Sequence, residues 1–141
     1  MRRISSVFAL AALGGILTAG GAYAATTTFK AALDGKSEVP PTTSSGTGSI
    51  EAVFDPATKK LMWKGSYSGL TGPETMAHFH GPAAAGANAG VVVPVDAKSS
   101  PFEGSATLTD EQAADLMAGK WYFNVHTAQN KAGEIRGQLA K

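Results

Sequence analysis

Apolar and polar residues alternate along a series of short segments in this chain, and residues typical of turns separate the segments. In the first segment Phe29, Ala31 and Leu33 are in phase, and residues 61–67 repeat the pattern later. Successive side chains of a strand point to opposite faces of its sheet, so a period of two predicts strands that bury one face. The sequence therefore predicts an antiparallel all-β fold.

The strand-like segments lie at residues 29–33, 50–54, 61–67, 74–80, 91–96, 102–108, 121–126 and 134–139. The turn sequence at 55–58 (DPAT) predicts a hairpin between the second and third segments. The last two segments are expected to form another hairpin across a polar loop. Pro94 marks the fifth as an edge strand or a bulge, because proline cannot donate to a central ladder. The pattern predicts one sandwich-like domain of about eight strands.

One short helix is expected to interrupt the strands after residue 108. Thr109 and Gln112 have the spacing of a capping box, in which each side chain bonds the backbone of the other residue. Leu116 and Met117 are the apolar positions of this helix, and Gly119 is suited to end it.

The N-terminal segment is predicted to be a signal peptide. Arg2 and Arg3 precede an apolar run at 7–17, and residues 22–24 (AYA) form a cleavage site of small residues. The run is short and interrupted by two glycines, which favours a removed signal over a membrane anchor. We therefore expect a signal peptide at 1–24, a mature domain at 25–141 with no membrane span, and a periplasmic or secreted location.

Composition narrows the class of protein further. The chain has no cysteine, so it has neither a disulfide framework nor a thiol for a lipid anchor. Without Arg2 and Arg3, ten basic residues face 11 acidic ones, and the basic residues are scattered. Nothing in this pattern indicates nucleic-acid binding.

The three histidines are the main candidates for function. His78 and His80 are one residue apart in a strand-like segment, so their side chains share a face with Met76. His126 is in the opposite phase to the apolar residues of the 121–126 segment, and the inward phase of Phe79 places the pair outside as well. We expect all three rings on the outer wall, partly covered by the loop 81–90.

Two histidines on one strand and a third on a neighbouring strand form a nitrogen-rich site suited to copper or zinc. The thioether of Met76 would favour copper, above all Cu(I). The predicted metal ligands are therefore His78, His80 and His126, with Met76 as a fourth. The chain lacks a cysteine or Gly-x-Ser-x-Gly nucleophile, and no spacing selects a carboxylate pair.

Four segments of the chain resemble the hallmarks of the CHRD domain, which is named after chordin. They are 38–41 (EVPP), 77–82 (AHFHGP), 119–127 (GKWYFNVHT) and 133–138 (GEIRGQ). Together they extend over nearly the whole predicted mature chain. The resemblance implies an exported binding module and does not imply a particular chemical activity.

A more distant resemblance is to copper/zinc superoxide dismutase, an eight-stranded Greek-key sandwich. Residues 65–70 (GSYSGL) leading to His78 and His80 are similar to the approach to that enzyme's first two copper ligands. His126 and Arg136 are similar to its last copper ligand and its anion-guiding arginine. The resemblance implies an antiparallel Greek-key barrel with one short helix and three copper ligands. The bridging histidine, the other zinc-site histidines and the disulfide cysteines have no counterpart here.

Three functions therefore remain open. The first is an exported CHRD module that binds copper for storage, delivery or resistance. The second is a copper-only enzyme similar to superoxide dismutase. In the third, the module binds another exported protein or a glycan, the histidines are structural, and Glu38, Glu134 and Arg136 form an ion pair beneath a loop.

Overall fold

The computed structural model describes residues 20–21 and 23–141, which contain eight strands and one helix. All strand pairs are antiparallel, which confirms the predicted fold class. The elements are β1 (Thr27–Asp34), β2 (Thr47–Asp55), β3 (Lys60–Ser68), β4 (Glu74–His80), β5 (Val91–Val95), β6 (Phe102–Thr107), α1 (Asp110–Met117), β7 (Tyr122–Thr127) and β8 (Ile135–Gln138).

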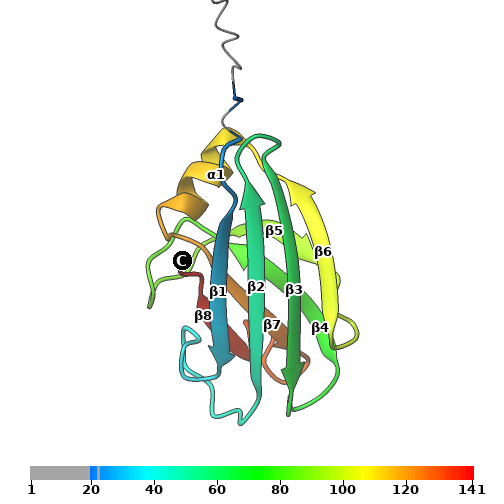
Figure 1. Cartoon of the computed structure of the whole chain (residues 1–141). Helices are drawn as coiled ribbons and strands as arrows, with labels where there is room; N and C mark the ends of the chain where they lie inside the picture. The colour runs from blue at the N-terminus through cyan, green and yellow to red at the C-terminus, as the bar shows by residue number, and fades with distance from the viewer. Residues whose placement is uncertain (1–19, 22) are drawn as a thin grey trace, which may run out of the picture.

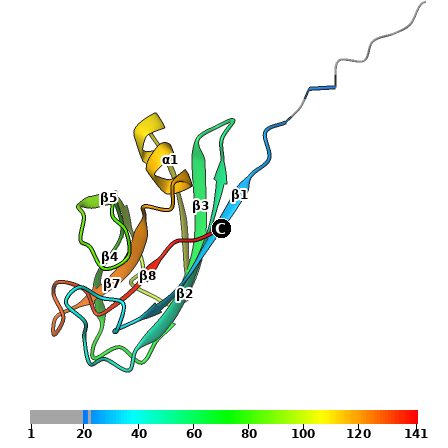
Figure 2. The same ribbon diagram turned by 90° about the vertical axis from the view of Figure 1, so that its left-hand side faces the viewer.

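The strands form a nearly closed barrel with two layers. Their order is β5-β4-β7-β8-β1-β2-β3-β6, and Figure 1 shows β1, β2, β3 and β6 in front of the other four. Figure 2 shows the two layers from the side. The chain crosses between layers after β3, β5 and β6, so that β7 lies beside β4 and β6 beside β3. This is a Greek-key arrangement.

Both predicted hairpins are present. β2 pairs with β3 along its whole length, and β7 pairs with β8 over four residues. β5 is an edge strand of the sheet, as Pro94 predicted. Proline has no backbone N–H, and on an edge strand no neighbouring strand requires that donor.

The core lies between the two layers and is rich in aromatic side chains. The Phe79 ring, which is fully buried, lies 5.0 Å from the ring of Phe123, 5.3 Å from Trp63 and 5.7 Å from Trp121. These tilted and edge-on contacts add to the hydrophobic stabilisation. Because Phe79 points inward, the residues next to it on β4 point outward.

The helix α1 covers one end of the barrel (Figure 1). Thr109 is its N-cap, and the capping box with Gln112 is formed in both directions. Leu116 is fully buried, but Met117 is 38% exposed, so only one of the two expected apolar positions packs into the core. Gly119 follows the helix with a positive φ of 74°, which glycine adopts without strain.

Most of the predicted signal peptide lies outside the described residues, because residues 1–19 and 22 are not among them. Among the residues that are described, no helix combines the length and the apolar character that crossing a membrane requires.

Candidate metal centre

The histidines lie on the outer face of the β4–β7 strand pair. Met76 is opposite His126 in the register of the two strands, and His78 is opposite Asn124. Residues directly opposite one another in an antiparallel pair point to the same face. The strand phase predicted from the sequence is therefore confirmed.

The three rings form a compact cluster. One ligand nitrogen each from His78, His80 and His126 lies within 4.8 Å of the other two, and His78 Nδ1 is 3.2 Å from His126 Nε2. Nitrogens around a tetrahedral metal ion are separated by about 3.3 Å when each bond is about 2.0 Å long. The cluster therefore needs only side-chain adjustment to hold one ion.

Two of the three rings are buried although they lie outside the barrel. His80 is 7% exposed and His126 is 6% exposed, whereas His78 is partly exposed. In Figure 2 the loops 81–90, 128–134 and 35–46 gather outside the β4–β7 layer. These loops make the histidine face a second, polar interior. The predicted cover by loop 81–90 is confirmed, and the other two loops extend it.

Backbone carbonyl groups of two covering loops orient the buried rings. His80 Nδ1 lies 3.0 Å from the carbonyl oxygen of Ala89, and His126 Nδ1 lies 2.8 Å from that of Lys131. A carbonyl oxygen only accepts, so each Nδ1 carries the proton and donates it. In the neutral rings both Nε2 lone pairs then face the cluster, which is the arrangement found around protein-bound metals.

Burial favours the neutral form of two rings. Burial, together with the nearby His126 and His80, lowers the pKa of His78 to about 4. Burial also lowers the pKa of His80, although its bonds to Ala89 and Asn124 oppose this shift. Since metals bind neutral imidazole, these two ligands need not lose a proton at pH 7 to bind one.

Asn124 and Glu38 are part of this polar interior and were not predicted as site residues. Asn124 Oδ1 lies 2.9 Å from His80 Nε2 and 3.0 Å from His126 Nε2, and Asn124 Nδ2 donates to Glu38 Oε1 at 3.1 Å. The alternation along β7 puts Asn124 on the same face as His126, so the sequence contained a signal that could have identified Asn124 as a site residue. Glu38 lies 86 residues away in sequence, and strand phase contains no information about it.

Burial raises the pKa of Glu38, while the Asn124 hydrogen bond, a backbone hydrogen bond from Val39 and the charge of Arg136 oppose the shift. Glu38 is only 3% exposed. A buried carboxyl held by a neutral amide stabilises the fold only while its hydrogen bonds are complete.

Arg136 forms no ion pair with Glu38 or Glu134 within the described residues, in contrast to the expectation from the sequence. Its guanidinium donates to Asn88 Oδ1 and to the carbonyl oxygen of Ala87. It also lies 3.4 Å from the centre of the Tyr122 ring. Arg136 therefore attaches the covering loop 81–90 to the barrel.

Met76 lies at the solvent side of the cluster. It shares the outer face with His78 and is 51% exposed. A groove of about 420 Å³ lies beside both residues, between the ends of β4 and β5. This groove leads from solvent to the least buried histidine.

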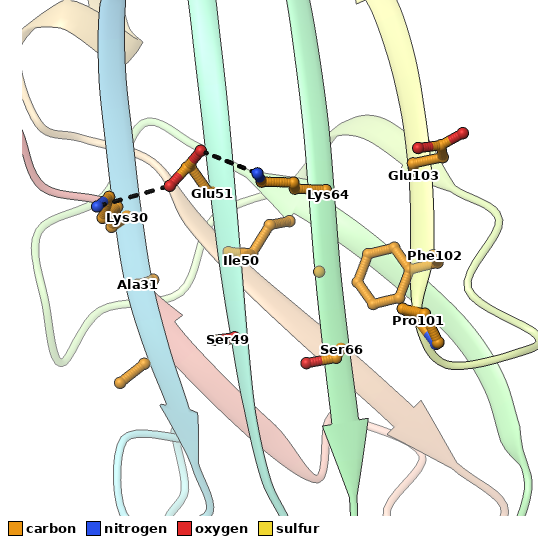
Figure 3. A pocket seen from close by; sticks show the side chains of 12 residues that line it. Lys30, Ala31, Ser49, Ile50, Glu51, Lys64, Ser66, Pro101, Phe102 and Glu103 are labelled. Atoms are coloured by element: carbon orange, nitrogen blue, oxygen red, sulfur yellow. Dashed lines mark ion pairs between the residues drawn. The ribbon is translucent and has the colours of Figure 1, made fainter.

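A second hollow, larger than this groove, lies elsewhere on the protein. It has a volume of about 820 Å³ and lies on the layer that contains β1, β2, β3 and β6. Figure 3 shows Glu51 between Lys30 and Lys64 at its edge, with separations of 3.5 and 3.6 Å. Both lysines are more than 70% exposed, so these ion pairs contribute little to stability. None of the three histidines lines this hollow.

A comparison with protein-family models supports the resemblance noted in the sequence. The model of the CHRD domain matches residues 29–139. The chain belongs to the CHRD family. The part of this CHRD chain that the family model matches extends from β1 to the end of β8. It includes all three histidines, Asn124 and Glu38. No curated protein and no solved structure matches the chain, so the resemblance to superoxide dismutase stays a hypothesis.

Proposed function

We propose that this CHRD protein is an exported binding module that holds one copper ion through His78, His80 and His126. The observation that carries the proposal is the convergence of the three rings, with one ligand nitrogen from each within 4.8 Å of the others. The carbonyl groups of Ala89 and Lys131 support it further, since they orient two of the rings as metal ligands require. Its role would be copper storage, delivery or resistance.

Met76 is proposed as a further ligand on the solvent side of the ion. A thioether is a soft donor that favours Cu(I), while imidazole binds both copper oxidation states and zinc. The exposed position of Met76 suits a ligand that receives the ion first and passes it to the buried rings.

Copper titration of the mature protein tests this function. The wild type is expected to bind one ion per chain, both as Cu(II) in air and as Cu(I) without oxygen. The double variant His78→Ala, His80→Ala is expected to lose this binding, and His126→Ala to weaken it strongly. The quantity measured is the stoichiometry and affinity in competition with a chelator of known affinity.

A matched pair of methionine variants separates the role of Met76 from a general effect of losing sulfur. Met76→Leu is expected to weaken Cu(I) binding, whereas Met62→Leu should not, because Met62 is equally exposed at 49% but lies on β3 in the other layer. Equal copper binding by the wild type and the double histidine variant would contradict the proposal. That result would favour structural histidines in a protein-binding or glycan-binding module.

Export is proposed from the N-terminal sequence together with the CHRD family, whose namesake is extracellular. Cleavage after residue 24 would leave a mature chain that begins at Ala25. N-terminal sequencing of the protein recovered outside the cytoplasm checks this start, and recovery of the uncleaved chain in the cytoplasm would contradict it.

A further inference from the structure

The buried side of the histidine cluster is closed by one oxygen atom, Asn124 Oδ1. It lies 2.9 Å from His80 Nε2 and 3.0 Å from His126 Nε2. Asn124 is 2% exposed, so bulk solvent does not reach this oxygen. The three histidine ligand atoms and this oxygen therefore surround one small volume.

In the neutral protein the contacts of this oxygen are not all hydrogen bonds. The Nδ1 protons of His80 and His126 are donated to Ala89 and Lys131, so neither Nε2 has a proton to give. The proton on His78 Nδ1 can serve His126 Nε2 at 3.2 Å. No neutral tautomer supplies a proton between His80 Nε2 and Asn124 Oδ1 while His80 Nδ1 donates to Ala89. The lone pairs of His80 Nε2 and Asn124 Oδ1 therefore face and repel one another. A cation bound between the two atoms would be coordinated by both, and the repulsion would be removed.

The orientation of the Asn124 amide is set from the side away from the cluster. Its Nδ2 donates to Glu38 Oε1 at 3.1 Å. The reversed amide would instead place Oδ1 against the carboxylate of Glu38, oxygen against oxygen, and would leave that buried carboxylate without this donor.

Gly133 leaves room for the contact between Glu38 and Asn124 because it has no side chain. Its φ is +129°, and a Cβ atom built there would overlap Glu38 Oε1 and crowd Asn124 Nδ2. The chain thus brings a buried carboxylate from the loop 35–46 against the amide through a close approach that a larger residue would obstruct.

We propose that Asn124 Oδ1 is a ligand of the metal ion on the buried side of the site, and that Glu38 is the residue that orients it. This inference rests on the proposed function and adds the identity of the ion that the site prefers. Three imidazole nitrogens and an amide oxygen suit Cu(II) and Zn(II), whereas Cu(I) has little affinity for an amide oxygen. The site therefore selects for the divalent ion, and Met76 at the solvent side serves Cu(I).

Asn124→Ala and Glu38→Met test the inference, because methionine removes the acceptor for Asn124 Nδ2, and Glu134→Gln is the control at a second buried glutamate. Glu134 is also a fully buried glutamate, but it contacts Ser44 and Thr71 and none of the histidines. Affinities for Cu(II), Zn(II) and Cu(I) are measured by chelator competition, and the Cu(II) forms are compared by electron paramagnetic resonance.

Both site variants are expected to weaken Cu(II) and Zn(II) binding by about 10–100-fold, to weaken Cu(I) binding less, and to change the Cu(II) spectrum. Glu134→Gln is expected to leave all three affinities and the spectrum as in the wild type. If Asn124→Ala does not fold, Glu38→Met decides, because it keeps the approximate size of the side chain while it removes the acceptor for Asn124 Nδ2.

Wild-type affinities and an unchanged Cu(II) spectrum in the site variants would overturn this inference and leave the histidine site intact. An equal loss of Cu(I) and divalent-ion affinity would also overturn it, because a general loss of structure would then explain the result. A wild type that binds none of the three ions would overturn the proposed function as well.

Discussion

The variant Glu134→Ala is expected to lose about 3 kcal/mol of the free energy of unfolding. Glu134 is fully buried on the outer side of the barrel. Its carboxylate accepts from the hydroxyl of Ser44 at 2.7 Å, from the backbone N–H of Thr71 at 2.8 Å and from the hydroxyl of Thr71 at 3.0 Å. Alanine leaves these three donors without this acceptor, and because the three hydrogen bonds are only partly buried we expect a cost of about 1 kcal/mol for each.

The conservative variant Glu134→Gln is expected to cost only about 1 kcal/mol. Its amide oxygen can accept the two bonds made to Oε1, and its amide nitrogen can donate to the hydroxyl of Thr71, which then donates to Thr127 instead. Urea unfolding of the three proteins measures the difference. A Glu134→Ala variant as stable as Glu134→Gln would show that the hydrogen bonds contribute little.

The same pair of variants tests the pH dependence of this contribution. Burial alone would raise the pKa of Glu134, but hydrogen bonds from Ser44 and Thr71 outweigh it and the pKa is lowered from 4.5. The unfolded state therefore takes up the proton first as the pH falls. The stabilisation is complete above about pH 4.5 and is lost as the pH falls through the lower, folded-state pKa. The stability difference between the wild type and Glu134→Gln should narrow over this acid range.

The second large effect is expected for Gly137→Ala, at the seam between the two layers. β1 and β8 meet at Asp34 and Arg136, and again through two backbone hydrogen bonds between Lys30 and Ala140. Between these points a Cβ atom at position 137 would overlap the carbonyl oxygen of Ala32. The overlap is with backbone, which cannot rotate away, so the strands must separate.

We expect Gly137→Ala to destabilise the fold by about 3 kcal/mol, at the upper end of the cost of overpacking. Gly72→Ala is the control, because a Cβ atom there has nothing within 4 Å, and it should change stability by less than about 0.5 kcal/mol. Thermal unfolding of both variants checks the difference. Equal melting temperatures would contradict the steric role of Gly137.

Most of the barrel could be predicted from the sequence because its signal is local. Each strand has its own alternation of apolar and polar residues, and the turn at 55–58 and the capping box at Thr109 are read from adjacent residues. The phase of β4 and β7 likewise placed the histidines on one face. Of the two apolar positions predicted in α1, Leu116 is buried and Met117 is 38% exposed.

The site needed more than strand phase. The sequence by itself determined which side of the barrel His78, His80 and His126 occupy, since side-chain direction in a strand follows from position alone. The tertiary structure decided that two of these rings are buried and which atoms they face. The carbonyl groups of Ala89 and Lys131 act through backbone atoms, which any residue supplies. Glu38 reaches Asn124 from a distant loop, and the course of such loops depends on contacts throughout the folded chain.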